Sequence, residues 1–202
     1  MVQNKQNRNL IMTTLLETLL AIRPKHNDFT RPELIQGYNE TEIQEIEQRY
    51  NLSVQGQFRE FLMTMGKCSG GVLLGQNLTI FNPNYQPTSQ SFGIENQQYW
   101  YEHEDLFNFF QKENINPIQE QLLYLDNRNE HISFYFLFTN RNENIVYEYD
   151  SNLDEIKLNE YGTLFDYLIW CRKDMIAQSK RWMQIFNANP NRFKELTTGR
   201  LL

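Results

Sequence analysis

The chain has 202 residues, a net charge of −6 and 40% hydrophobic residues, and it contains 14 Phe, 11 Tyr and 3 Trp. Burial of so much ring area offsets the entropy of ordering, which excludes an intrinsically disordered chain. No run of about 18 apolar residues occurs, so we expect no membrane span. The apolar segment 10–22 is interrupted by Thr13, Thr14, Glu17 and Thr18, and no small-residue cleavage site follows it. We therefore expect no signal peptide and a cytoplasmic location.

The charges are distributed unevenly along the chain. Between Pro32 and Cys171 there are 21 acidic and 7 basic residues, whereas the two flanks together carry 12 basic and 4 acidic residues. This asymmetry predicts an acidic body with basic ends, which attracts basic partners and repels nucleic acid. The alternative is a solvated acidic surface that keeps the protein soluble by self-repulsion.

The first third of the chain reads as helical. Apolar spacing predicts a helix over residues 10–22 that ends before Pro24. Thr41 and Gln44 fit a capping box at the start of a second helix, whose apolar face carries Ile43, Ile46 and Tyr50. A third helix ends near Gly66 and has its buried face at Phe58, Phe61, Leu62 and Met65. Short strands are expected at 72–74 and 78–81, followed by a surface loop over 82–96, and loops this long are often functional.

The remainder alternates helices and strands. A helix is predicted over 104–114, rich in Phe. In the strand 132–139, Phe134, Phe136 and Phe138 point to one face and Tyr135 and Leu137 to the other. Residues 145–149 return as its antiparallel partner, and 122–125 form a third strand. After a connector at 158–162, Thr163 caps a last long helix that reaches Phe186. This order indicates an α+β fold, with a mostly antiparallel sheet covered by helices and with extra N-terminal and C-terminal helical segments.

No repeat or low-complexity linker divides the chain, so a single domain is the simplest organisation. We expect its core at residues 41–180. Residues 1–40 are expected to add an N-terminal tail, helix and loop, and residues 181–202 a C-terminal helical tail.

Five short segments occur in an order that resembles the SUKH superfamily, which contains a fungal cell-wall-synthesis regulator and many bacterial immunity proteins. They are two helix motifs, a glycine turn, a strand and a helix start: Ile43–Glu47, Phe58–Leu62, Ser69–Gly71, Val146–Asp150 and Thr163–Leu168. The resemblance covers about Thr41 to Lys173. The chain departs from the family at Ser53-Val54, where the family has Leu-Pro, and at Ser69, where it has Asn. The resemblance implies the family's fold and a non-catalytic binding role.

The residues that carry chemistry in enzymes are sparse. His26, His103 and His131 lie far apart, and Cys68 and Cys171 have no CxxC partner, so we expect no metal site. No nucleophile elbow, phosphate loop or dinucleotide fingerprint occurs, so we expect no cofactor and no catalysis. The run 102–105 admits an alternative, a metal or a carboxylate-based hydrolase. Its plainer interpretation is acidic residues that complement a helix dipole.

The resemblance implies an immunity protein whose partner is a protein toxin, the C-terminal toxin domain of a secreted protein. If the toxin is a nuclease, its active site is basic, and carboxylates can mimic the phosphate it binds. We predict a partner-binding surface made of three aromatic residues and seven acidic ones: Tyr99, Trp100, Tyr101, Glu102, Glu104, Asp105, Glu148, Asp150, Asp154 and Glu155. The alternative function is a regulatory or scaffold protein without a toxin partner.

Overall fold

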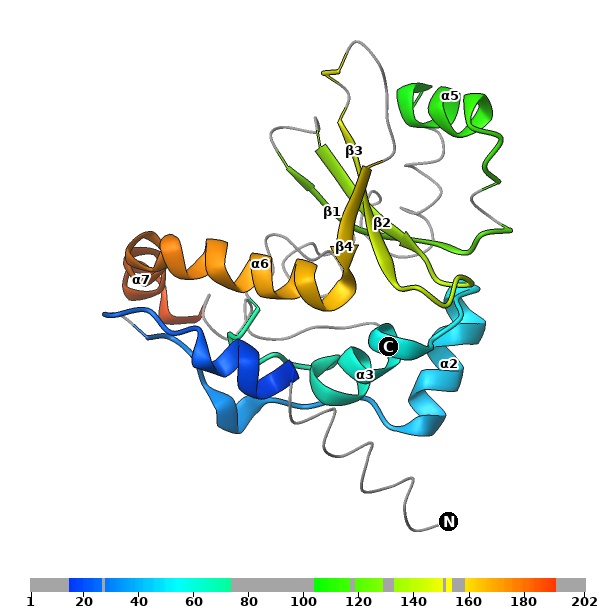
Figure 1. The fold of residues 1–202 in the computed structure, drawn as a ribbon. Coiled ribbons are helices and arrows are strands. Elements are labelled where there is room, and N and C mark those ends of the chain that lie inside the picture. Colours follow the sequence, from blue (N-terminus) through cyan, green and yellow to red (C-terminus); the bar gives the residue numbers. More distant parts are fainter. Residues whose placement is uncertain are drawn as a thin grey trace.

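A computed structural model gives the fold of the protein (Figure 1). It describes residues 15–26, 28–73, 104–116, 119–128, 133–150, 152–153 and 159–191. Within these ranges the architecture is α+β, as predicted, and contains a four-stranded antiparallel sheet. None of the helices in these ranges combines the length and apolar character that crossing a bilayer requires.

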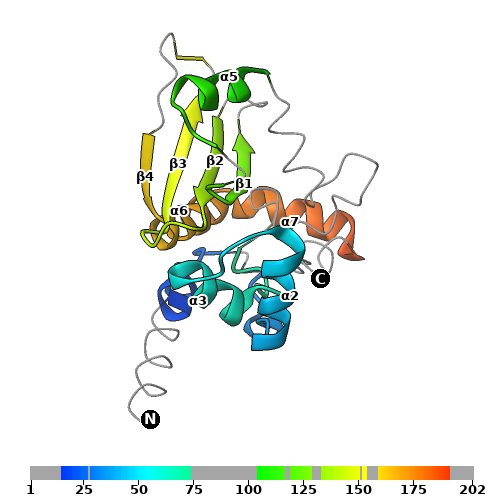
Figure 2. The same cartoon turned by 90° about the vertical axis from the view of Figure 1, so that its right-hand side faces the viewer.

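The sheet is a meander in the order β1-β2-β3-β4. Its strands are β1 (Leu122–Arg128), β2 (Ser133–Phe138), β3 (Ile145–Asp150) and β4 (Asn159–Thr163). The predicted hairpin and third strand are confirmed, with Phe136 opposite both Tyr124 and Tyr147. A helix α5 (Glu104–Lys112) lies at one end of the sheet, and α2 (Glu40–Tyr50) and α3 (Gly56–Met65) lie at the other (Figure 2).

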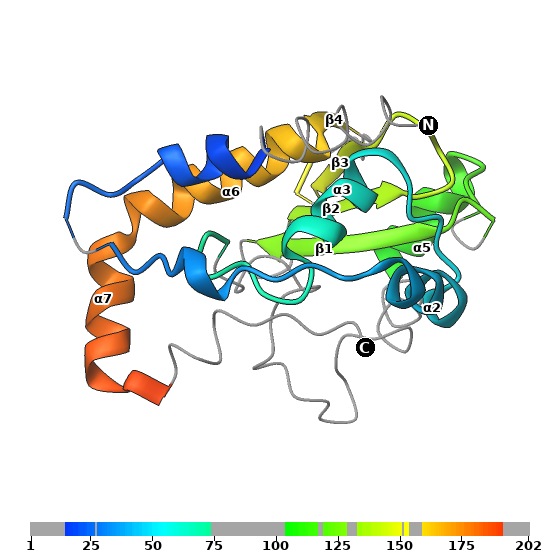
Figure 3. The same ribbon diagram turned by 90° about the horizontal axis from the view of Figure 1, so that it is seen from below.

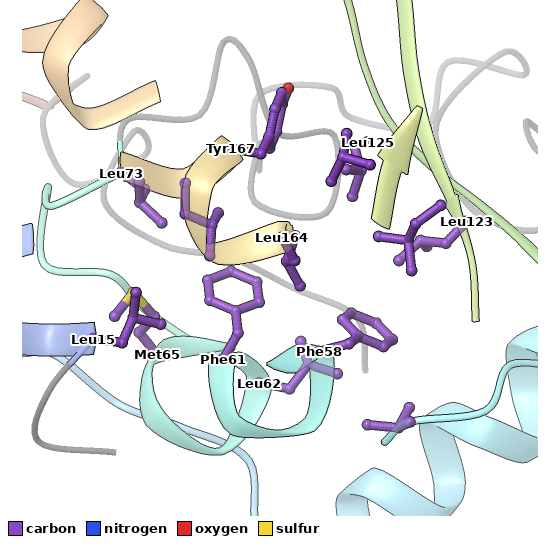
Figure 4. Close-up of a cluster of buried hydrophobic side chains, with 14 of the residues drawn as sticks. Leu15, Phe58, Phe61, Leu62, Met65, Leu73, Leu123, Leu125, Leu164 and Tyr167 are labelled. Atoms are coloured by element: carbon purple, nitrogen blue, oxygen red, sulfur yellow. The ribbon is translucent and has the colours of Figure 1, made fainter. Parts of the chain in front are cut away.

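Both faces of the sheet are buried, because β2 alternates two sets of large side chains. On one face, Phe136 and Phe138 pack with Tyr147, Tyr149 and the α5 residues Phe109 and Phe110. On the other face, Tyr135 and Leu137 join the main core, which α3 and α6 (Leu164–Ala177) close. Figure 4 shows Phe58, Phe61 and Leu62 of α3 meeting Leu164 and Tyr167 of α6 beside Leu123 and Leu125 of β1.

Asn144, at the end of the β2–β3 turn, joins the sheet to two helix starts. Its side-chain Oδ1 accepts a hydrogen bond from the Phe58 amide of α3 at 3.2 Å. Its carbonyl accepts one from the Leu164 amide of α6 at 2.9 Å. Both amides are first-turn donors that have no partner inside their own helices. Asn144 has a φ of 51°, a left-handed conformation that asparagine tolerates better than most residues. Asn144 therefore links the β2–β3 turn to the first turns of α3 and α6.

The N-terminal segment belongs to the same core. Residues 15–21 are helical and lie alongside α6 (Figure 3), with Leu15 and Leu19 in the main cluster. Arg172 of α6, which has 0% exposure, holds the chain that follows them. Its guanidinium donates to the carbonyls of Ile22, Gly71 and Val72 and to the Thr30 hydroxyl, at 2.9–3.2 Å. Burial lowers the pKa of Arg172 to about 10, and nearby Asp28 opposes that shift, so the side chain is charged at neutral pH.

Four local expectations from the sequence are wrong. The cap of α2 is Asn39, which forms the capping box with Glu42, and Thr41 lies inside the helix. Residues 72–73 form a bend after Ser69, not the start of a strand, while 74 and 78–81 lie outside the described residues. The connector at 158–162 is largely an edge strand, β4. The last helix breaks at Gln178, where α7 (Ser179–Ala188) starts and packs Trp182 and Phe186 against Phe29.

Replacing Asn39 by alanine is expected to lower the free energy of unfolding by about 1 kcal/mol, the usual effect of losing a side-chain cap. Its Oδ1 accepts from the Glu42 amide at 3.1 Å, and the Glu42 carboxylate accepts from the Asn39 amide at 2.9 Å. Thr41→Ala is the matched control, and we expect it to change stability by less than half as much. Urea denaturation followed by circular dichroism measures both. Equal losses would contradict the cap assignment.

Candidate partner-binding surface

The residues predicted to bind a partner are placed unevenly by the structure. Glu148 and Asp150 lie in β3. Glu104 and Asp105 open α5, where the structure describes their backbone only. The other six lie outside the described residues: Tyr99, Trp100, Tyr101, Glu102, Asp154 and Glu155. The geometry can therefore be built only around β3 and its neighbours.

The two described acidic segments lie towards opposite faces of the sheet. Phe109 of α5 packs on Tyr149, with ring centroids 5.1 Å apart, so α5 covers the face that carries Tyr147 and Tyr149. Strand alternation turns Glu148 and Asp150 to the other face, the one that carries Tyr135. The Tyr135 hydroxyl confirms this by donating to Glu148 Oε1 at 3.0 Å. Glu148 thus lies on the face of the sheet opposite to the one that α5 covers.

Several acidic residues outside β3 form ion pairs with basic side chains. In the helical layer, Glu45 pairs with Arg49, Glu42 with Lys67 and Glu40 with Arg59. Arg141, in the turn that follows β2, pairs with Glu120, which precedes β1. Its guanidinium also lies over the ring of Phe138. Among the described residues no basic side chain pairs with Glu148 or with Asp150, whose Oδ1 accepts from the Asn152 amide at 2.8 Å. Glu148 and Asp150 are therefore two carboxylates of β3 that form no ion pair with the side chains the structure describes.

Beside Glu148 lies a cluster of four aromatic rings, Tyr135, Tyr161, Tyr167 and Trp170, here named the four-ring cluster. Each ring contacts the other three, with centroids 5.3–5.9 Å apart. Three segments supply them: β2, the edge strand β4, and α6. Tyr135 and Tyr167 are buried, whereas Tyr161, Trp170 and Glu148 are half-buried. The cluster is therefore part of the core on one side and part of the surface on the other.

Sequence reasoning did not single out Tyr161 or Trp170 as binding residues, and it assigned Tyr135 only to a strand face. The available signal was the spacing of Tyr167 and Trp170, which places both on one side of a helix that starts at Thr163. The missing information was the register, which sets Tyr135 directly opposite Glu148. Register depends on turn geometry and is not encoded in either strand alone.

The described residues offer little for catalysis. They contain no group of three or more His, Cys, Asp or Glu side chains that could hold a metal ion. Both cysteines are buried, and burial raises the pKa of the Cys68 thiol. A thiol in that environment is a poor nucleophile, because the thiolate is the reactive form.

Comparison of the whole chain with protein-family models, with curated proteins and with solved structures found no match.

Proposed function

We propose that the chain is an immunity protein that binds a cognate bacterial toxin and neutralises it by covering its active site, without catalysing a reaction. The observation that carries the proposal is the way the five segments resembling the SUKH superfamily come together. Ile43 and Ile46 of α2, Phe58, Phe61 and Leu62 of α3, Val146 of β3 and Leu164 and Leu168 of α6 all belong to one core. The glycine turn at 69–71 supplies a carbonyl to Arg172 of α6. A SUKH-like fold is part of the proposal.

The acidic surface supports a nuclease as the toxin. A nuclease must hold phosphate, so its active site carries an excess of Lys and Arg. Glu148 and Asp150 have no basic partner among the described residues, and the body between Pro32 and Cys171 is strongly acidic. Such a surface accelerates association with a basic site and opposes binding to nucleic acid itself. The partner is therefore a protein, and binding is expected to weaken as salt concentration rises.

The test is co-expression with the C-terminal domain of a large secreted protein encoded beside this gene. We expect cells that carry the toxin domain alone to die and cells that carry both proteins to survive, with a stoichiometric complex on purification. Death with no complex would contradict the immunity function and would favour a regulatory scaffold, for which a pull-down from host lysate is the next experiment.

Reversing the charge of Glu102, Glu104 and Asp105 together is expected to weaken toxin binding more than tenfold, because charge complementarity sets the association rate and part of the affinity. Glu102 lies outside the described residues, and α5 begins at Glu104. The matched control is Glu40→Lys with Glu45→Lys, since both carboxylates already pair with arginines on the helical layer. Titration calorimetry on the purified complex measures the affinities. Unchanged affinity in the triple variant would remove α5 from the binding surface.

A further inference from the structure

We propose that the α7 end of the molecule docks onto the acidic β3 side of a second copy of this chain. Its exposed cations come from two segments far apart in the sequence, the loop that follows the first helix and the region around the α6–α7 junction. They are Arg23, Lys25, Lys173, Lys180 and Arg181, here named the basic surface. Such association goes beyond the proposed function, because it requires no toxin.

Packing between the loop and α7 brings the two segments together. The centroids of the Phe29 and Phe186 rings lie 5.8 Å apart, and both rings belong to one buried cluster. Arg172 of α6 holds the same loop by donating to the Ile22 carbonyl and the Thr30 hydroxyl. Figures 1 and 3 show the loop beside the junction of α6 and α7. The basic residues of both segments therefore lie at one end of the molecule.

This end carries more positive charge than its own acidic residues can offset. Residues 22–31 and 172–191 contain seven basic side chains and two acidic ones. Burial raises the pKa of one of these acids, Asp28, but hydrogen bonds within the loop and the charges of Arg172 and Arg23 lower it overall. That carboxylate therefore already lies near two cations, and a net positive charge remains.

Four cations of the basic surface have no acidic partner in the described part of the chain. Lys25, Lys173, Lys180 and Arg181 are exposed and form no ion pair with any side chain that the structure describes. Lys180 and Arg181 belong to the first turn of α7, which contains no acidic residue and has no side-chain cap. Basic residues there add to the positive end of the helix dipole. A negatively charged partner surface would stabilise this arrangement.

The same chain carries the complementary charge on its sheet. Glu148 and Asp150 of β3 form no ion pair with the described side chains. The sheet lies at the start of α6 and α7 at its end, and the 14 residues of α6 span about 21 Å. The Debye length at physiological ionic strength is about 8 Å, so the cations of α7 do not neutralise these carboxylates within one molecule. Two copies that associate head to tail bring the opposite charges into contact.

A compact acidic surface suits the basic surface better than a nucleic acid does. The 10 residues of α7 span only about 15 Å, and an extended phosphate backbone reaches beyond them. It then meets the body between Pro32 and Cys171, whose 21 acidic and 7 basic residues repel phosphate. A basic toxin is not attracted to this end either. A second copy carries the required carboxylates, so it is the partner that we infer.

Sedimentation equilibrium of the full chain is the first experiment. We expect a mass of 24.3 kDa in about 0.5 M salt and a mass that rises with protein concentration in about 0.1 M salt, because salt screens pairing between exposed charges. A mass of 24.3 kDa in the low-salt buffer at every concentration up to about 0.5 mM would overturn the proposal. Because this assay omits the toxin, its failure is distinct from failure of the co-expression test.

Lys180→Glu with Arg181→Glu is expected to weaken the association about tenfold, because it reverses two charges of the basic surface. The matched control is Arg49→Glu with Lys112→Glu, which changes the net charge equally at exposed positions of α2 and α5. The control should associate at least as strongly as wild type. Melting temperatures identify any general loss of folding. Equal weakening in both variants would show that net charge alone matters and would contradict a docking surface.

Mixing two variants tests the head-to-tail geometry. Glu148→Gln with Asp150→Asn keeps the basic surface and removes the carboxylates, whereas Lys180→Glu with Arg181→Glu does the reverse. Each is expected to stay near 24.3 kDa alone, and an equimolar mixture should form a dimer and nothing larger, because one intact pair of surfaces remains. A mixture that stays monomeric would overturn the proposal. Binding of a labelled DNA strand of about 20 nucleotides by wild type, and not by the basic-surface variant, would assign this end to phosphate instead.

Discussion

Arg172→Met is expected to lower the free energy of unfolding by about 4 kcal/mol, a large part of the 5–15 kcal/mol that typically holds a domain folded. Methionine keeps much of the apolar volume and removes all the donors. The carbonyls of Ile22, Gly71 and Val72 then remain without Arg172 as their donor, together with the Thr30 hydroxyl. Each acceptor left buried and unsatisfied costs roughly 1–3 kcal/mol, and local relaxation limits the total.

The matched control for Arg172→Met is Lys173→Met, which removes an exposed cation from the adjacent position of α6. We expect this control to change stability by less than about 0.5 kcal/mol, as surface substitutions usually do. Arg172→Lys should recover part of the loss, because an ammonium donates three bonds but cannot reach all four acceptors. Urea denaturation of the three variants gives the comparison. A loss below 1 kcal/mol in Arg172→Met would show that the buried guanidinium does not organise the N-terminal segment.

Gly37→Ala is expected to cost at least about 3 kcal/mol, at the upper end of the usual effect of overpacking. A Cβ at this position would lie 1.7 Å from the carbonyl oxygen of Met63 and 2.9 Å from the amide nitrogen of Thr64. Both atoms belong to the backbone of α3, so no side-chain rotation relieves the contact. Backbone hydrogen bonds hold the residues on both sides of Gly37 in place. Gln36 exchanges amide–carbonyl bonds with Cys68, and the Tyr38 amide donates to the Leu62 carbonyl.

Gln36→Ala is the control for Gly37→Ala, because it shortens the exposed side chain next to it and leaves the backbone bonds in place. We expect the control to unfold at nearly the wild-type urea concentration. We expect Gly37→Ala to unfold at a much lower concentration, or to accumulate as insoluble protein. A soluble Gly37→Ala variant with wild-type stability would mean that the segment does not lie against α3 as described.

The predictable parts of the fold are those where burial follows a regular period. Phe134, Phe136 and Phe138 alternate with Tyr135 and Leu137, which predicts β2, and Phe58, Phe61 and Leu62 recur at helical spacing in α3. The edge strand β4 was missed because Asn159, Glu160 and Gly162 give it no apolar alternation, and its place is set by ladder bonds to β3.

Competing local signals explain two other errors. Asn39 with Glu42 and Thr41 with Gln44 both fit a capping box, and the pattern does not rank them. Asn39 caps the helix because Glu42 completes the reciprocal bond and also pairs with Lys67. The break at Gln178 has no glycine or proline to announce it. It places Trp182 and Phe186 of α7 against Phe29, a contact between distant parts of the chain that local sequence cannot encode.

The sequence predicted an acidic surface, but it did not predict which of the acidic residues form ion pairs. The excess of acidic residues between Pro32 and Cys171 pointed to β3 as one source of carboxylates, and Glu148 and Asp150 lie there. The ion pairs of Glu40 and Glu42 join α2 to residues of other segments and depend on how α2 packs, so the sequence did not predict them. Whether the surface binds a toxin stays a prediction.

The bonds of Arg172 also set the order in which the protein can fold. They join residues separated by 150, 142 and 101 positions along the chain. Contacts between such distant residues raise contact order, and high contact order slows folding, because loop closure costs entropy before the contact stabilises anything. During synthesis the segment around Ile22 and Thr30 has no guanidinium to bind until α6 leaves the ribosome. Closure of the main core around this segment is therefore expected to wait until α6 has been synthesised.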